Sequence, residues 1–476
     1  MLAFFRINDP YRLIGIFLLI VLIRLPFFLG EMPLTIPELQ WMIVGETISF
    51  KNILYVDVWD DIAPLAALIY SLIDIIGGRT QLGYQILAVL AVFLQCFLFN
   101  QLLIVSKAFK ENTYVPGLIY AVLMSAFFDF FTLSPALMSC LFQLLVINGI
   151  FYHIASKGKD ELFLNLGLAL GLAALIYLPS LCYLPITIVA LGLYSSVNIK
   201  KYLLLFFGFM FPVVLVGIYF FWHGALLDFV DYYFLSWLST PFQEYFDLKS
   251  LLIITLPTFL LMVFSWLKIY TTSRFNNHQT NYIQVMLVFL VAGFIMVFFA
   301  GERVPHQMVV FAAPVAFFLS HMFLLIKRRF IAELVFLLFF GWTLTTNYGV
   351  LYRFILPAGL VNYDNLLVSE TKWDTIVKGK KILILGDQPD AYLHAYLATP
   401  YLNWGLSENH FNQLRSFNTL SSIYETFDQQ MPEVIIDQQN LVPELFQLMP
   451  SIAAQYSKQG DAYLLKSKST RGQANN

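Results

Sequence analysis

The sequence predicts a polytopic α-helical membrane protein with a small α/β domain at its C-terminal end, and three observations support this. The chain has 476 residues, of which 59% are hydrophobic and only 12% are charged, whereas soluble proteins carry about 25% charged residues. Apolar runs long enough to cross a bilayer recur along most of the chain. From about Val350 onward, short buried strands instead alternate with helical stretches.

The membrane part is expected to cover residues 1–350 and to contain about eleven spans. The apolar runs lie near residues 11–29, 83–105, 114–131, 136–155, 162–178, 181–197, 202–222, 251–270, 281–300, 307–326 and 330–349. The first run lacks a small-residue cleavage site, so we expect a retained helix. The net charge of −2 indicates no nucleic-acid partner. The three cysteines lie inside apolar runs, without disulfide or zinc spacing.

A further short run at 63–78 carries Asp74 and decides the topology. If this run does not cross, thirteen Lys and Arg residues of the short loops fall on one side of the membrane and only five on the other. The positive-inside rule then predicts a cytoplasmic N-terminus and a re-entrant or interfacial helix at 63–78. The hairpin of residues 31–80 and the C-terminal domain are consequently expected outside the cytoplasm.

The C-terminal domain is expected to be a small α/β domain over residues 351–468. Three short buried segments predict strands, and one segment between them predicts a helix. The strands are expected at 381–386, 433–437 and 462–466, and the helix at 391–398. Residues 469–476 are polar, and we expect them to form a disordered tail.

The hairpin of residues 31–80 gathers acids beside apolar sequence, where carboxylates are costly unless they are solvated, paired or used. Glu38 follows Pro37, which favours the first turn of a short helix on the membrane surface. A carboxylate fixed in this way could accept a proton from a hydroxyl group, as a general base. The alternative is an acid that only stabilises the helix dipole.

The densest acidic segment of the hairpin follows Glu38. It contains two aromatic and three acidic residues, namely Tyr55, Asp57, Trp59, Asp60 and Asp61. Such a mixture suits a sugar, which is held by hydrogen bonds to carboxylates and by stacking on aromatic rings. The acids could also hold a divalent cation through oxygen ligands. The alternative is a solvated turn before an interfacial helix.

Three basic residues near the expected outer face are further candidates for substrate binding. Arg24 lies near the outer end of the first run, where it could reach the interface or pair with a hairpin acid. Arg303 and His306 lie in a tight loop between two spans. A planar guanidinium and an imidazole suit a phosphate group, although a charged turn is the alternative. The histidines show no metal-ligand spacing, and we assign no metal site.

These segments together resemble the GT-C superfamily of membrane glycosyltransferases. A segment Tyr55-x-Asp57-x-x-Asp60 leads into the helix that begins at Pro64, and the outer loop Arg303-x-x-His306 runs into Phe311-x-x-Pro314. The tail segments KILILGDQPDAYLHAYLATPYLNW and PEVIID are similar to the small outer α/β domain of that superfamily. The early loop departs from the family pattern, because Pro37 stands where an acid often precedes the glutamate.

The resemblance implies an inverting glycosyltransferase of the mannosyl, aminoarabinosyl or galacturonosyl type. The donor would be a sugar linked to a polyprenyl phosphate, and the acceptor an extracytoplasmic lipid, glycan or protein. The protein would lie in the bacterial inner membrane, in contact with membrane lipid, with its C-terminal domain in the periplasm. Glu38 or Asp57 would deprotonate the acceptor hydroxyl, while Arg303 and His306 would neutralise the departing phosphate.

Two other functions stay open at the sequence level. A lipid or solute transporter or flippase would need ionisable residues within several spans. Asp129 and Gln95 are the few polar candidates that we name within the spans, and the acids gather outside the spans instead. A non-catalytic membrane scaffold, whose tail domain binds a partner, is the third possibility.

Overall fold

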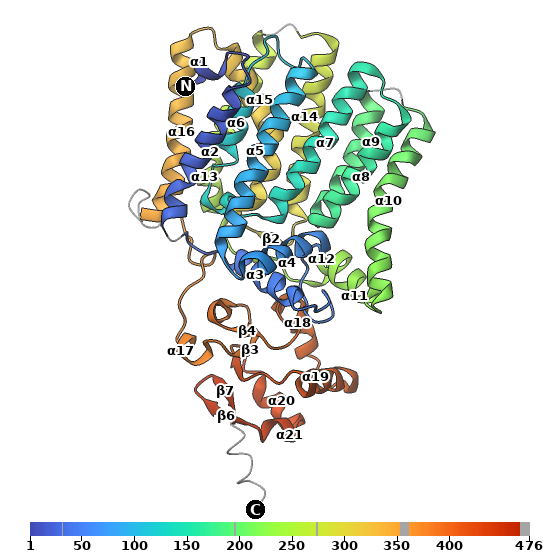
Figure 1. Cartoon of the computed structure of the whole chain (residues 1–476), viewed down its shortest axis with the longest axis vertical. Helices are drawn as coiled ribbons and strands as arrows, with labels where there is room; N and C mark the ends of the chain where they lie inside the picture. The colour runs from blue at the N-terminus through green and yellow to red at the C-terminus, as the bar shows by residue number, and fades with distance from the viewer. Residues whose placement is uncertain (31, 195–196, 273–274, 353–360, 467–476) are drawn as a thin grey trace, which may run out of the picture. The chain divides into compact units, whose positions relative to one another are not determined.

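The computed structural model describes residues 1–30, 32–194, 197–272, 275–352 and 361–466. Figure 1 shows the helices and strands of the chain, most of which are labelled. The expected disordered tail, 469–476, lies outside the described residues. The chain divides into two compact units. The helical unit contains 1–33, 81–216 and 242–366, and the mixed unit contains 34–80, 217–241 and the chain from Leu367 onward.

Helices that are long and apolar enough to cross a membrane number eight among the described residues. They are α2 (Arg12–Leu29), α5 (Gln81–Val105), α7 (Pro135–Ser156), α10 (Ile199–Trp222), α13 (Leu248–Thr272), α14 (Asn277–Phe298), the continuous segment formed by η4 (Pro305–Phe311) and α15 (Ala312–Leu325), and α16 (Arg329–Tyr352). All eight coincide with apolar runs of the sequence. The protein is therefore a mostly helical chain of membrane-protein composition.

The other three apolar runs form shorter helices. The run at 162–178 forms α8 (Asp160–Ile176), and the run at 181–197 forms η2 (Leu178–Cys182) and α9 (Tyr183–Tyr194). The run at 114–131 forms α6 (Val115–Leu123) and then a 3-10 turn, η1 (Phe128–Phe131). Arg24 donates hydrogen bonds to backbone carbonyls in and beside this turn, which supplies partners that a continuous helix would otherwise provide.

The mixed unit begins with two helices packed against each other, α3 (Ile36–Ser49) and α4 (Pro64–Gly77). Their backbones approach closely at Gly45, where a Cβ atom would lie only 2.8 Å from the carbonyl oxygen of Tyr70. Helix α4 has 14 residues, so it measures about 21 Å, which is less than the bilayer core of about 30 Å. Its length therefore suits the interfacial helix that the sequence predicts at 63–78.

A five-stranded sheet forms the centre of the C-terminal domain, which is called the tail domain below and is described over residues 367–466. The order of its strands is β4-β3-β5-β7-β6. The strands β4 (Tyr396–Leu397), β3 (Lys381–Leu385) and β5 (Val434–Asp437) are parallel, whereas β7 (Ala462–Leu465) and β6 (Tyr456–Gln459) are antiparallel to their neighbours. Three helices accompany the sheet, namely α18 (Trp404–Phe411), α19 (Phe417–Gln429) and α20 (Val442–Leu448). The buried side chains Leu383, Ile435 and Phe427 belong to the common core. The three predicted strands are thus present.

The helix predicted at 391–398 is wrong. Only one 3-10 turn, η5 (Asp390–His394), forms there, and it is followed by strand β4. The backbone amide of Tyr396 donates to Lys380, and Ala398 donates to Ile382, so pairing with the neighbouring strand replaces helical bonds. The apolar pattern of this segment does not reveal that competing partner.

Shorter elements complete the chain. The mixed unit also contains α11 (Leu226–Phe229), the π-helical turn η3 (Val230–Phe234) and α12 (Ser236–Ser239), together with α17 (Asp374–Val377) and α21 (Pro450–Ala453). The helical unit begins with α1 (Leu2–Phe5) and contains a pair of two-residue parallel strands, β1 (Gln243–Glu244) and β2 (Glu302–Arg303). These strands fix the backbone of the loop that carries Arg303.

Candidate functional site

Glu38 lies in the first turn of α3, as the sequence predicts, with Pro37 beside it. The chain before this helix is held by the tail, because the amide of Val368 donates to the carbonyl of Leu34 at 2.9 Å. Thr35 forms a β-bridge with Leu367 at the same place. The side chain of Glu38 is completely buried. This carboxylate is therefore fixed inside the mixed unit and does not lie on an open surface.

The acidic loop, residues 51–63, begins with a tight turn that Asp57 stabilises. The carboxylate oxygen Oδ2 of Asp57 accepts from the amide of Ile53 at 2.6 Å, and the Asp57 amide donates to the Ile53 carbonyl at 2.8 Å. Tyr55 occupies the left-handed region, with φ of 71°, and its amide donates to the carbonyl of Val58. Asp57 is half-buried, and one of its oxygens holds the turn together.

Tyr55 is packed into the mixed unit. Its side chain has no exposed surface, and its hydroxyl donates to the carbonyl of Ile62 at 2.7 Å. The ring lies beside those of Phe220 and Tyr233, at centroid distances of 5.3 and 6.4 Å. Burial raises the pKa of the Tyr55 hydroxyl well above its ordinary value. The residue therefore supports the acidic loop from within and presents no surface to a sugar.

Asp60 and Asp61 are adjacent but differ in exposure. Asp60 is 5% exposed, and its Oδ1 accepts from the amide of Ile62 at 2.9 Å. Asp61 is exposed, and the side-chain amide of Asn403 lies 3.4 Å from its Oδ1. Among the four predicted acids, Asp61 is the one exposed residue, although burial around its carboxyl group raises its pKa. It is the most exposed acidic residue of this loop.

Trp59 joins the acidic loop to the tail domain. Its amide donates to the carbonyl of Pro400 at 2.7 Å, and its carbonyl accepts from the amide of Asn403 at 3.1 Å. The indole ring lies 4.9 Å from the rings of both Tyr232 and Tyr401, and 5.3 Å from the His410 ring. The aromatic hub formed by these four rings is thus built from three separate segments of the chain.

The surroundings of the aromatic hub disfavour charge. Burial raises the pKa of the Tyr232 hydroxyl, and nearby Asp228 adds to that shift. Burial also raises the pKa of Tyr401 and lowers the pKa of the His410 imidazole. Uncharged rings that contact one another over this area hold the loop by packing.

In the helical unit, His306 is paired with Asp129. The ring Nδ1 of His306 lies 3.0 Å from Oδ2 of Asp129, and the His306 amide donates to the same oxygen at 2.8 Å. Both side chains are at most 2% exposed. The Nε2 atom lies 3.9 Å from the carboxylate of Glu302. The sequence did not assign Asp129 to this role, although it is the one acid between Glu111 and Asp160.

The two predicted arginines have different partners. Arg303 makes an ion pair of 2.5 Å with Glu244, and its guanidinium lies over the ring of Phe242 at 5.2 Å. Arg24 is 1% exposed and donates to the carbonyls of Met124, Phe130 and Phe131. Arg24 thus neither reaches the interface nor pairs with a carboxylate among the described residues. It organises the η1 turn, which also carries Asp129.

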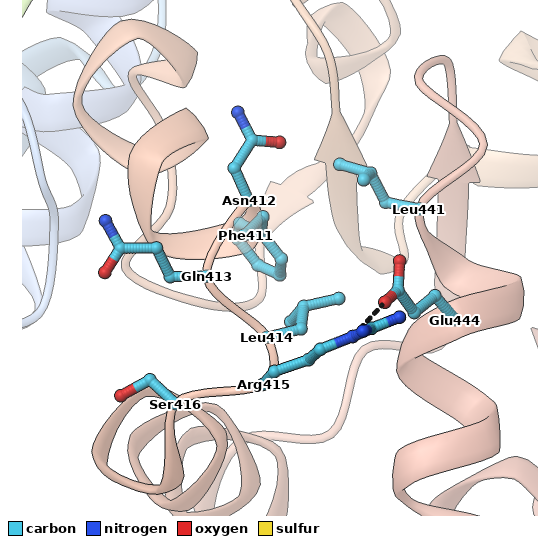
Figure 2. A pocket seen from close by; sticks show the side chains of 8 residues that line it. All are labelled: Phe411, Asn412, Gln413, Leu414, Arg415, Ser416, Leu441 and Glu444. Carbon is cyan, nitrogen blue, oxygen red and sulfur yellow. Dashed lines mark ion pairs between the residues drawn. The ribbon is translucent and has the colours of Figure 1, made fainter.

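A separate pocket of about 370 Å³ lies in the tail domain (Figure 2). It is lined by residues 411–416 and by Leu441 and Glu444, and Arg415 makes an ion pair of 3.5 Å with Glu444. Both partners are largely exposed, so this pair contributes little. None of the predicted site residues lines the pocket.

No group of three or more His, Cys, Asp and Glu residues within the described part of the chain could hold a metal ion. The acids of the acidic loop instead bond mainly to backbone amides close to them in sequence. The arrangement supplies an exposed carboxylate in the mixed unit and a buried His–Asp pair in the helical unit. These are parts suited to proton transfer and to the binding of an anion.

Comparison with known proteins gives matches in structure but not in sequence. No protein-family model and no curated protein sequence matches the chain. The structure of ArnT from Cupriavidus metallidurans, bound to undecaprenyl phosphate, is similar with a TM-score of 0.54 and 10% identity, over 96% of this chain and 98% of that one. The apo oligosaccharyltransferase of Archaeoglobus fulgidus gives a TM-score of 0.49 and 11% identity, over 90% and 69% of the two chains.

The match to ArnT extends over the helices and the tail domain alike, since nearly all of both chains is covered. At 10% identity it is a likeness of fold. The chain therefore has a fold similar to that of ArnT.

Proposed function

We propose that this protein is an inverting glycosyltransferase that moves a hexosyl or pentosyl group from a polyprenyl-phosphate donor to an extracytoplasmic acceptor. The observation that carries the proposal is the likeness to ArnT over 96% of the chain, because that structure contains undecaprenyl phosphate. The exposed Asp61 supports it, since transfer to a hydroxyl needs a base that the acceptor can reach. A lipid, a glycan or a protein could supply the hydroxyl.

We rank the candidate bases by how exposed each residue is to solvent. Asp61 is exposed, Asp57 is half-buried with one oxygen bonded to the Ile53 amide, and Glu38 is completely buried. A general base must come within about 3 Å of the hydroxyl that it deprotonates. We therefore place Asp61 first, before the two residues that the sequence favoured. In a single displacement, the acceptor oxygen bonds to the sugar carbon, its proton passes to the carboxylate, and the lipid phosphate departs with the bonding electrons.

Arg303 and His306 are proposed to stabilise the departing phosphate. The ion pair of Arg303 with Glu244 is partly exposed, so a phosphate dianion can compete for the guanidinium. The Asp129 carboxylate lies 3.0 Å from Nδ1 of His306 and so fixes the orientation of the ring, which leaves Nε2 as the atom that would face a phosphate. Both groups would then oppose the negative charge that develops on the leaving group.

The test is transfer in proteoliposomes that contain the purified full-length chain. Undecaprenyl phosphate itself is the first probe, and we expect saturable binding by native mass spectrometry. Radiolabelled undecaprenyl-phosphate mannose, aminoarabinose and galacturonate are then offered with envelope lipids, glycans and proteins as acceptors. Transfer of label from one donor supports the proposal. Movement of the intact labelled lipid across the bilayer, without transfer, would show a flippase instead.

The orientation is part of the proposal, with the N-terminus in the cytoplasm and the tail domain outside the bacterial inner membrane. Loop charge supports it, because thirteen of the short-loop basic residues would lie inside. A cysteine placed at exposed Lys372 should react with a membrane-impermeant maleimide in spheroplasts, whereas one at exposed Lys200 should react only after lysis. The opposite labelling pattern would contradict the orientation.

A further inference from the structure

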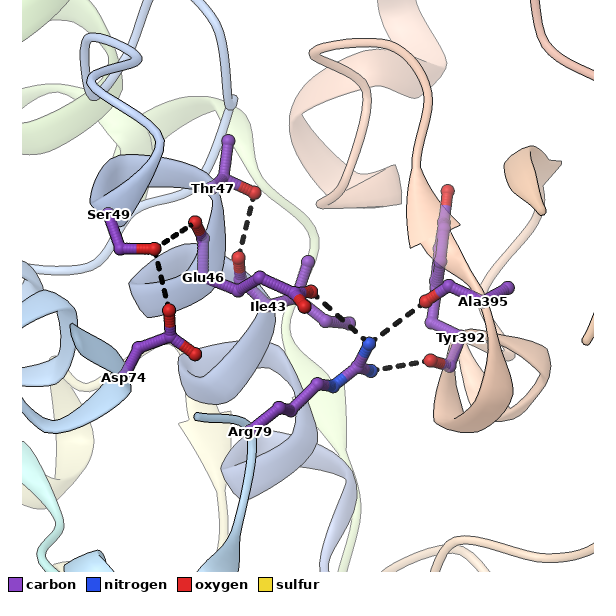
Figure 3. A network of polar contacts seen from close by, with 8 residues as sticks. All are labelled: Ile43, Glu46, Thr47, Ser49, Asp74, Arg79, Tyr392 and Ala395. Carbon is purple, nitrogen blue, oxygen red and sulfur yellow. Dashed lines mark hydrogen bonds and ion pairs between the residues drawn. The ribbon is translucent and has the colours of Figure 1, made fainter. Parts of the chain in front are cut away.

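Arg79 binds two carbonyls of the tail domain from the end of α4. Its Nη1 donates to the carbonyl of Ala395 at 2.9 Å, and its Nη2 donates to the carbonyl of Tyr392 at 2.5 Å (Figure 3). Nη1 also lies 3.4 Å from the carboxylate of Glu46 on α3. The Arg79 side chain is 15% exposed, so the contact is largely shielded from water. One guanidinium thus links α3, α4 and the tail domain.

Both carbonyls lie at the end of the 3-10 turn η5, where Tyr392 also accepts from the backbone amide of Ala395 at 3.3 Å. A helix end leaves carbonyl oxygens without backbone partners, and a cation is the favoured group there. Glu46 adds a charge on the other side of the guanidinium, while Ser49 contacts Asp74 at 2.6 Å and connects α3 to α4. Figure 3 shows these contacts as one connected network. The tail is thereby attached to the helices that flank the acidic loop.

The attached segment leads directly to the acidic loop. After Ala395 the chain forms β4 and then reaches Pro400 and Asn403, which hold the backbone of Trp59 from both sides. The Asn403 side chain also lies 3.4 Å from Asp61. The loop is thus fixed at its ends by α3 and α4 and near its middle by residues 400–403. Arg79 joins these two supports at one point.

We propose that Arg79 is a positioning residue, which sets the place of Asp61 by holding residues 392–403 against α3 and α4. The functional part of this inference rests on the proposed glycosyl transfer. Arg79 is itself bonded to backbone carbonyls and to Glu46, so it acts through the loop and has no contact with the acceptor in this role. A displacement of about 1 Å at a reacting group can lower a rate about a hundredfold.

The test compares Arg79→Met and Arg79→Lys with Lys372→Met, a control that removes an exposed ion pair of the same unit. We expect Arg79→Met to lower kcat at least about tenfold while the KM for the polyprenyl-phosphate donor stays unchanged. Arg79→Lys keeps the charge but not the planar fork, so it should recover part of the loss. Hydrogen exchange at the Trp59 amide should be faster in Arg79→Met and unchanged in the control.

The exchange measurement separates this inference from the proposed function. If the wild-type chain transfers no sugar but Arg79→Met exposes the Trp59 amide, the positioning role stands and the enzymatic proposal fails. If Arg79→Met has wild-type kcat and wild-type protection at Trp59, the positioning role is wrong. Should Arg79→Met not fold, Arg79→Lys decides, because unchanged protection and kcat in that folded variant would overturn the inference.

Discussion

The acidic loop of the mixed unit and the Asp129–His306 pair of the helical unit hold their carboxylates in opposite ways. In the loop, Asp57 and Asp60 bond to nearby backbone amides, and Asp61 is left exposed. In the helical unit, Asp129 is completely buried and bonds to both the amide and the ring of His306. The first arrangement shapes a turn around a reachable carboxylate, whereas the second orients another side chain.

The comparison shows that a count of acids does not locate a base. Four acids of the hairpin, namely Glu38, Asp57, Asp60 and Asp61, are candidates in the sequence pattern, yet their surroundings differ. A carboxylate that accepts backbone amide bonds is fixed in place, and a buried one bonded to histidine orients that histidine. Under the proposed function, the exposed one is the candidate that a substrate hydroxyl would reach. Substitutions in both regions can test this division of roles.

The largest effect is expected in the acidic loop, from Asp61→Asn. If Asp61 is the base, kcat for sugar transfer should fall about 10²–10⁴-fold, because an amide cannot take up the proton. Asp57→Asn is the matched comparison, since its amide oxygen can still accept from Ile53. The initial rate of sugar transfer from labelled donor measures kcat for both variants. Equal and large losses in the two variants would show that the loop acts as a unit and that exposure does not identify the base.

In the helical unit, Asp129→Asn should act mainly on stability. It weakens two charge-assisted contacts to His306, and such hydrogen bonds contribute about 1.5–3 kcal/mol each. Thermal unfolding in detergent should therefore shift to a lower temperature. Asp160→Asn, which removes an exposed pair with Lys200, is the control and should shift it little. A stable Asp129→Asn variant with normal activity would remove His306 orientation from the proposal.

A smaller effect is expected from Tyr55→Phe. This change removes one buried hydrogen bond, to the Ile62 carbonyl, and leaves the ring in place. The free energy of unfolding should fall by about 0.5–1.5 kcal/mol. The KM values for donor and acceptor should stay the same, since the hydroxyl has no exposed surface. A raised acceptor KM with unchanged stability would instead make Tyr55 a substrate ligand.

The smallest effect, and one that depends on pH, is expected from Glu46→Gln. Burial raises the pKa of Glu46, and the attraction of Arg79 offsets this only in part. A raised pKa in the folded state means that the contribution of Glu46 is fully present below its ordinary pKa of about 4.3 and is lost as the pH rises through the folded value. At pH 7 the variant should thus unfold at the same or a higher temperature than wild type, and this advantage should vanish near pH 4. An unfolding temperature clearly below that of the wild type at pH 7 would contradict this prediction.

The sequence predicted the elements better than their partners. Apolar length located the eight long helices, and buried strand patterns located β3, β5 and β7. The helix at 391–398 was wrong because strand pairing, a long-range contact, determines that segment. The role of Asp129 was missed for a similar reason, since its partner His306 lies 177 residues away. Hydrophobic patterns report burial locally and do not specify which distant groups meet.

The ordering of the acidic loop also depends on when the residues that contact it from the tail domain are synthesised. Asn403 lies 342 residues beyond Asp61, so synthesis at about 5–20 residues per second separates them by roughly 20 to 70 seconds. During that time the loop lacks Pro400, Asn403 and the rings of Tyr401 and His410. The chain can therefore insert most of its helices before the loop is completed. A protein shortened before residue 400 would keep every predicted acid and still lack the ordered loop.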